Sequence, residues 1–188
     1  TITVSKAGDA KENLATAWYK VGMQTPHFAR LISDGLTLKS SDPGAEIEMR
    51  ISGLPEGMHS LLTYHNLPLS GPKEGFSAIG IFRDGVLLTQ VQPSVRAFKT
   101  KDAAKAYISF QAATGKDVVL RFKAMNTGAN IIRDIIINSL EINTPDPSKQ
   151  ANAYFPLNAD EHVETDGTRL SLCWQGAVGA EQHDIYFG

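Results

Sequence analysis

The sequence predicts an all-β fold, a β-sandwich of the jelly-roll type, followed by a short, partial second β module at the C-terminus. Short segments that alternate polar and apolar residues recur as far as Ile142. Turn-forming pairs such as Asp84-Gly85 separate them. Parallel βαβ units need crossover connections of about a dozen residues or more, usually helices, and the segments between these strands lack them.

The expected strands follow one another at the regular spacing that is typical of a β-sandwich. They cover 46–51, 59–65, 78–82, 87–91, 106–112, 117–124 and one long final strand within the isoleucine-rich stretch 131–142. Asp84-Gly85 forms the hairpin turn between the third and the fourth of them. Two short helices are also expected, one over 9–19 with Asp9 or Asn13 as its N-cap, and one over 101–106.

A linker is expected where Pro145 and Pro147 stand among polar residues, in the stretch 143–150. The main domain is therefore 1–145, and 146–188 holds the linker and a partial β module. A segment of that length rarely builds a stable core of its own. We expect it either to pack on the main domain or to open a second domain.

Composition narrows the classes of function. The chain has 188 residues, 42% of them hydrophobic, and a net charge of -2. A packed core is expected, while the charge argues against a nucleic-acid partner, which calls for a basic face. No apolar run approaches the roughly 20 residues that span a membrane. The single cysteine, Cys173, excludes an internal disulfide and a cysteine-rich zinc site, and we expect it to be a small buried apolar residue.

The tail carries a specific resemblance. Residues 170–176 read LSLCWQG, Ala180 follows, and 183–188 read HDIYFG. This pattern resembles the opening strands of the fibronectin-type-III-like modules found in bacterial polysaccharide lyases and glycoside hydrolases. The resemblance implies that Trp174 is the core tryptophan of such a module, of which the later strands are absent.

The main domain resembles the galactose-binding-like and malectin-like jelly rolls that are fused to polysaccharide lyases of gut Bacteroidetes. The segments that carry this likeness are 18–36, which contains RLISDG, then 51–59, ISGLPEGMH, and 130–142. His59 stands where tyrosine is commoner. The resemblance implies a non-catalytic carbohydrate-binding module of an exported polysaccharide-degrading enzyme, either secreted, periplasmic or on the cell surface. Its implied partners are a polysaccharide, guessed to be pectin-like, and the catalytic domain of the parent enzyme.

Sugar recognition requires flat aromatic faces and planar polar groups, usually on loops at one end of a sandwich. Three stretches supply such groups. The candidate carbohydrate-binding residues are Trp18, Tyr19 and His27 in the first, Tyr64, His65 and Asn66 in the second, and Asn126, Asn130 and Arg133 in the third. Asn130 enters through the resemblance, because the loop before the last strand commonly supplies an asparagine in such jelly rolls.

Simpler interpretations stay open for these residues. Trp18 and Tyr64 fit a core, and Asn126 and Asn130 fit turns around Gly128. An enzyme is not expected, because the sequence lacks G-x-S-x-G, Walker and Rossmann patterns. No organic cofactor is expected, and whether the domain binds a structural calcium ion is left open. Its suppliers would be Asp34, Asp42, Glu46 and Asp134.

Three functions can be told apart by structure. A carbohydrate-binding module predicts exposed aromatic residues at one end of the sandwich. A structural spacer that orients a catalytic domain predicts that Trp18 and Tyr64 are buried and that a large patch faces the partner. A protein-interaction sandwich predicts a flat, exposed apolar face without a cleft.

Overall fold

A computed structural model describes residues 1–19, 31–39, 44–97, 102–126, 128–150, 152–155, 167, 169, 172–177 and 179–182. The chain divides into two compact units, Thr1–Thr144 and Pro145–Gly188. Each unit is described by itself. The boundary lies one residue before the domain boundary proposed from the two prolines.

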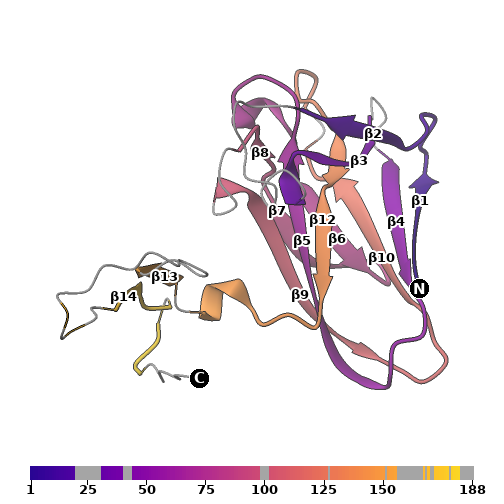
Figure 1. The fold of residues 1–188 in the computed structure, drawn as a ribbon. Helices are drawn as coiled ribbons and strands as arrows, with labels where there is room; N and C mark the ends of the chain where they lie inside the picture. The colour runs from indigo at the N-terminus through magenta and orange to yellow at the C-terminus, as the bar shows by residue number, and fades with distance from the viewer. Residues whose placement is uncertain are drawn as a thin grey trace. The chain divides into compact units, whose positions relative to one another are not determined.

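In its described residues the first unit consists mainly of strands, with the 3-10 turn η1 between β5 and β6 (Figure 1). Its elements are β1 (Ile2–Gly8), β2 (Ala15–Trp18), β3 (Asp34–Leu38), β4 (Ala45–Ile51), β5 (Gly57–Leu67), η1 (Lys73–Gly75), β6 (Ile79–Arg83), β7 (Val86–Val91), β8 (Ser94–Val95), β9 (Ala104–Ala112), β10 (Val118–Ala124), β11 (Ile135–Ile137) and β12 (Ser139–Ile142).

Two main sheets pack face to face, which confirms the predicted all-β sandwich (Figure 1). One is a five-stranded antiparallel sheet in the order β1-β4-β10-β6-β7. The other is built on β5, which pairs with β12, with β9 and, through a short parallel contact, with β8. A smaller sheet, β11-β3-β2, lies at one end of the sandwich.

The core follows from alternation within the strands. In β4, Ile47, Met49 and Ile51 point inward, and their partners across the sheet on β10 are also apolar. Phe110 on β9 reaches the same cluster from the opposite sheet. Burying one such side chain contributes roughly 1.5–3 kcal/mol, so the alternating pattern fixes which face of each strand is buried.

The outer face of the five-stranded sheet carries a ladder of ion pairs. The Arg121 guanidinium lies 3.0 Å from Glu46 and 2.6 Å from Glu48, and Glu48 also contacts Arg50 at 2.9 Å. Lys123 approaches Glu46 at 3.7 Å. Surface pairs of this kind contribute little to stability individually, but they mark this face as one that faces solvent.

The expectation of one long strand over 131–142 was wrong. The segment forms two strands in different sheets, and the break falls at Asn138. The Asn138 Nδ2 donates to the carbonyls of Asp34 at 2.7 Å, Asn66 at 3.1 Å and Ile32 at 3.2 Å. Its Oδ1 accepts from the Asn66 backbone amide at 2.6 Å. These long-range hydrogen bonds take the place of the ladder bonds that a continuous strand would make.

Both expected helices were also wrong over most of their described residues, and in 101–106 the 3-10 conformation is found at Asp102. Within 9–19, the residues Ala15–Trp18 form β2, which pairs with β3. Within 101–106, the residues from Ala104 onward belong to β9, which pairs with β5 along its whole length. Pairing with distant strands overrides the weak local helix signal in both segments.

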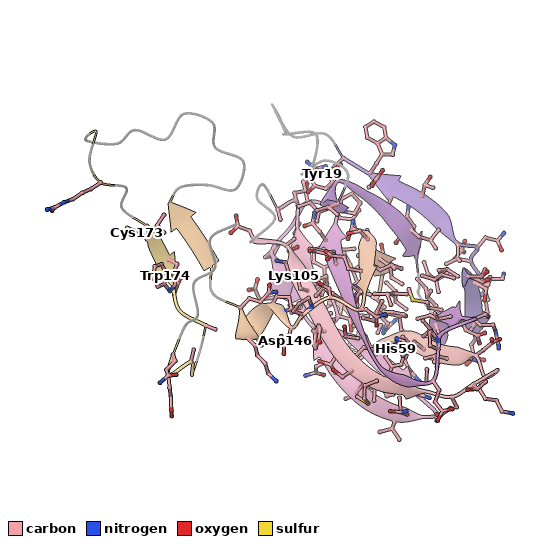
Figure 2. The ribbon with its side chains drawn as sticks, turned by 60° about the horizontal axis from the view of Figure 1, so that its bottom comes forward. Tyr19, His59, Lys105, Asp146, Cys173 and Trp174 are labelled. Atoms are coloured by element: carbon pink, nitrogen blue, oxygen red, sulfur yellow. The ribbon has the colours of Figure 1, made fainter. Side chains whose placement is uncertain are left out.

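The second unit begins with a 3-10 turn, η3 (Pro147–Lys149), for which Asp146 is the N-cap and accepts from the Ser148 amide at 2.9 Å. Its strands β13 (Asn152–Phe155) and β14 (Cys173–Gln175) pair antiparallel with a bulge. Cys173 and Trp174 lie on β14 (Figure 2). Cys173 is exposed, so the expectation that it is buried was wrong. Within the described residues β14 pairs with β13 alone, and Cys173, Trp174 and Gln175 are all exposed.

Candidate functional site

The β2–β3 hairpin places an aromatic ring beside a carboxylate. Trp18 ends β2 and Asp34 begins β3, and the two residues are direct cross-strand partners. Direct partners project their side chains from the same face of the sheet. The hairpin sits close to the Asn138 break, because a Cβ on Gly35 would lie 2.9 Å from both the Asn138 Cα and the Ile137 carbonyl oxygen. Glycine at position 35 therefore allows β3 to approach the core closely.

A groove of about 390 Å³ follows this face of the hairpin. We call it the Trp18 groove, and its lining residues are Thr16, Ala17, Trp18, Asp34, Gly35 and Leu36. The Trp18 side chain is 72% exposed. The carboxylate of Asp34 offers only acceptors, and the indole offers an apolar face and one N–H donor. This combination suits a ligand with both C–H faces and hydroxyl groups.

The residue after Trp18 anchors the strand in the core. The Tyr19 side chain is buried (Figure 2), and its hydroxyl donates to the Ala97 carbonyl at 2.9 Å and accepts from the Asn66 Nδ2 at 2.6 Å. Its backbone amide donates to the Ser33 carbonyl. Burial raises the pKa of Tyr19, partly offset by the hydrogen bond from Asn66. Tyr19 therefore holds Trp18 in place, and the prediction that Tyr19 itself contacts sugar is corrected.

The second predicted stretch is also inside the protein. Asn66 is fully buried, and its amide bonds with Tyr19, with the Ile32 carbonyl at 3.0 Å and with the Ser94 hydroxyl at 2.8 Å. All of these groups belong to a network that joins β5 to β8 and to Tyr19 and Ile32. A surface ligand cannot reach it, so Asn66 is a structural residue.

His65 and Tyr64 lie on opposite faces of β5, and both are buried. Burial lowers the pKa of His65 to about 4, against a smaller opposing effect of its 2.6 Å hydrogen bond to the Ile136 carbonyl. Burial and the 2.9 Å hydrogen bond from its hydroxyl to Glu141 raise the pKa of Tyr64 to about 12. Their predicted contact with sugar is corrected for the same reason as that of Asn66.

The third predicted stretch borders a charged pocket of about 580 Å³. Its lining residues are Glu12, Lys39, Ala129, Ile131, Ile132, Arg133 and Asp134. Arg133 Nη2 donates to the Gly128 carbonyl at 3.3 Å, which fixes the guanidinium against its own loop. Asn126 and Asn130 are exposed, and the Asn126 Oδ1 accepts from the Gly128 amide at 2.9 Å, as the turn interpretation expects. Of the three predicted residues, Arg133 lines the pocket.

The remaining expectations divide between described and undescribed residues. His27 and Asp42 lie outside the described residues. Among those that are described, no group of three or more His, Cys, Asp or Glu side chains is placed to hold a metal ion. Asp34 and Asp134 line different hollows, and Glu46 is paired with Arg121.

Sequence reasoning missed Asp34, Glu12 and Lys39 as parts of a site. The sequence suggested Asp34 only as a calcium ligand. Its position beside Trp18 follows from the pairing of β2 with β3, and the two residues are far apart in the sequence. Glu12 and Lys39 flank the β2–β3 hairpin, and no local pattern marks them.

No helix in the described part of the chain combines the length and the apolar character needed to cross a membrane.

No protein family matches the sequence, and no curated protein matches it. Similar solved structures include the enzymatically active domain of tailspike protein 4 of bacteriophage CBA120, with a TM-score of 0.39 and 12% identity over 76% of this chain. A Paenibacillus xanthan lyase has a TM-score of 0.45 and 7% identity over 82% of this chain. A Bacillus subtilis protein has a TM-score of 0.38 and 13% identity over 75% of this chain. The matched regions cover 19%, 14% and 32% of those chains, so this chain spans less than a third of each.

Proposed function

We propose that the first unit is a non-catalytic carbohydrate-binding module of an exported polysaccharide-degrading enzyme, and that the Trp18 groove holds a sugar ring. The observation that carries this proposal is the Trp18 side chain, 72% exposed and directly opposite Asp34. An exposed tryptophan is uncommon. Here the next residue, Tyr19, is held in the core by the hydrogen bonds of its hydroxyl to Ala97 and Asn66.

The chemistry of the groove fits a sugar in two ways. One face of a pyranose ring is made of C–H groups and stacks on an indole. Such a contact buries a large area, and the rigid aromatic side chain loses little conformational entropy when it forms. The ring hydroxyls donate to a carboxylate, and Asp34 supplies one beside the indole. Because β2 is held by Tyr19, little ordering is needed on binding, which favours affinity.

A binding role without catalysis is supported by the groove's polar groups. Glycoside hydrolysis generally uses two carboxyl groups that flank the bond to be cleaved. Among the described residues that line the Trp18 groove, Asp34 is the one with a carboxyl group. The proposal therefore assigns recognition to this unit and bond cleavage to a separate catalytic domain of the parent enzyme.

The second unit is proposed to be the opening of a fibronectin-type-III-like module. Its strands β13 and β14 pair antiparallel, with Trp174 on β14 opposite Ala153. This antiparallel pairing supports the proposal, which rests on the resemblance of 170–176 and 183–188 to the opening strands of such modules. The proposal gives this unit no role in sugar binding.

A spacer function is the second candidate, and the edge strand β7 favours it. Val86, Leu87 and Leu88 follow one another on β7 and are 63%, 42% and 38% exposed. Natural sheet edges usually carry charges or proline as protection, and consecutive exposed aliphatic residues are typical of a surface that contacts another domain. In this interpretation the unit orients its catalytic neighbour and binds no sugar.

Affinity electrophoresis distinguishes the two candidates. The whole chain would be run through gels that contain pectic, xylan or host glycans, with and without calcium. The binding module predicts that at least one polymer retards the protein and that Trp18→Ala abolishes the retardation. Trp174→Ala is the matched control, because it removes an exposed tryptophan from the other unit and should change nothing. Unchanged mobility in every polymer would favour the spacer.

A further inference from the structure

A second hollow, of about 330 Å³, lies on the outer face of the sheet formed by β5 and β9. Its lining residues are Met58, His59, Ser60, Tyr107, Ser109 and Asn143. Ser60 and Ser109 are direct cross-strand partners, and Tyr107 comes two residues earlier on β9, so it lies on the same face.

The polar groups of this hollow are only partly used by the protein. Within the described part of the chain, the Ser60 hydroxyl donates to the Thr144 carbonyl at 2.7 Å, whereas the hydroxyls of Tyr107 and Ser109 have no hydrogen-bond partner. One end of the Asn143 side-chain amide is held by the His59 ring at 2.9 Å, and the other end has no partner in the same part of the chain. His59 is in turn fixed by the Pro55 carbonyl at 2.9 Å and stacks on Phe110. Pre-positioned polar groups thus surround an open space.

The lining of the β5–β9 hollow differs in charge from the outer face of the five-stranded sheet, although Lys105 and Glu141 lie elsewhere on the same side of the sandwich as the hollow. On the five-stranded sheet, Arg121 and its neighbours form the ladder of ion pairs. Around the β5–β9 hollow the exposed groups are instead hydroxyls, an amide and the Met58 side chain, which is 67% exposed. A neutral lining favours a neutral ligand. The small volume and the hydroxyl groups suit one ring of a polar molecule better than a protein surface, whose contacts are broader and centred on apolar residues.

We propose that the β5–β9 hollow is a second carbohydrate-binding surface, for a neutral oligosaccharide. A pyranose ring lies against Tyr107 and Met58, and its hydroxyls hydrogen-bond with Ser109 and Asn143. The surface uses none of the residues of the Trp18 groove. This proposal rests on the proposed function only in taking carbohydrate as the class of ligand.

The test is a chemical-shift titration of the ¹⁵N-labelled whole chain with cellohexaose, xylohexaose and mannohexaose. We expect at least one of these neutral sugars to shift the backbone amides of Ser60 and Tyr107. Ser109→Arg should weaken that binding at least tenfold, because the new side chain fills the hollow from an exposed position. Ser5→Arg, an exposed serine-to-arginine change on the outer face of β1, is the matched control and should leave the binding unchanged.

The outcomes separate this proposal from the Trp18 groove. Shifts confined to the Trp18 indole would support the proposed function and overturn the second surface. Shifts at Ser60 and Tyr107 that persist in Ser109→Arg, or no shift there with any of the three sugars, would also overturn it. If Ser109→Arg instead converts a dimer to a monomer in sedimentation, the face is a contact between copies of the chain and the proposal is wrong. Tyr107→Leu should repeat the loss seen in Ser109→Arg while keeping the packing of this position against the core.

Discussion

Acid should destabilise the first unit through His65. The imidazole is fully buried, its Nδ1 lies 2.6 Å from the Ile136 carbonyl oxygen, and its Nε2 lies 2.8 Å from the Thr63 hydroxyl. The ring also lies 6.0 Å from that of Phe122. A charged imidazole in this place would lose its hydration, so burial lowers the pKa of His65 to about 4.

The magnitude follows from linkage between protonation and folding. In the unfolded chain the histidine titrates near its ordinary pKa of 6.5, so as the pH falls the unfolded state takes up the proton first. The stability that the neutral ring supports is fully present above pH 6.5 and is lost as the pH falls toward 4. A shift from 6.5 to about 4, at about 1.36 kcal/mol per unit, corresponds to about 3 kcal/mol in all and to about 2 kcal/mol between pH 8 and pH 5.

The assay is urea denaturation followed by far-ultraviolet circular dichroism at several pH values between 8 and 5. His65→Gln provides the matched variant, because glutamine can donate to the Ile136 carbonyl but does not titrate. We expect the free energy of unfolding of the wild type to fall by about 2 kcal/mol more than that of His65→Gln over this range. Equal pH dependence in the two proteins would refute the assignment of a neutral, buried His65.

Three further changes test the packing and the site. Asn138→Ala should lower the free energy of unfolding by about 3 kcal/mol or more, because it leaves buried backbone groups unpaired, whereas the exposed Asn126→Ala should stay within about 0.5 kcal/mol. Similar losses in urea denaturation would contradict the role given to Asn138. Gly35→Ala should lower the free energy of unfolding by about 1–3 kcal/mol, because the new Cβ meets backbone atoms that cannot move aside. The control Gly75→Ala adds a Cβ that meets nothing within 4 Å and should be tolerated. Equal melting temperatures for the two variants would contradict this prediction. Trp18→Ala should leave the thermal unfolding midpoint almost unchanged, since the side chain is exposed, and a large drop would place Trp18 in the core after all.

Local pattern was enough for the strands of the sandwich. The alternation in β4 and β10 gave both the type of element and its buried face, because Ile47 and Phe122 point into the same core. The division of the isoleucine-rich segment between two sheets was not predictable in this way. Residues on both sides of Asn138 are apolar or part-buried, and the break depends on carbonyl groups of Ile32 and Asp34, more than a hundred residues earlier.

The candidate site was predictable in part for a similar reason. Aromatic and amide residues occur both on the surface and in the core, so the sequence could not show that Trp18 is exposed and Asn66 is buried. Their environments differ only through pairing, since Trp18 ends an outlying strand and Asn66 lies inside β5, the central strand of its sheet. Asp34 joins the site only once β2 and β3 are known to be partners.

The central claim is that a sugar ring binds in the Trp18 groove, and isothermal titration calorimetry tests it most directly. An oligosaccharide from whichever polymer retards the protein would be titrated into the wild type, Trp18→Ala, Asp34→Ala and Trp174→Ala. The account predicts at least a tenfold loss of affinity for the first two variants and wild-type affinity for Trp174→Ala. Wild-type affinity in Trp18→Ala and Asp34→Ala would contradict it.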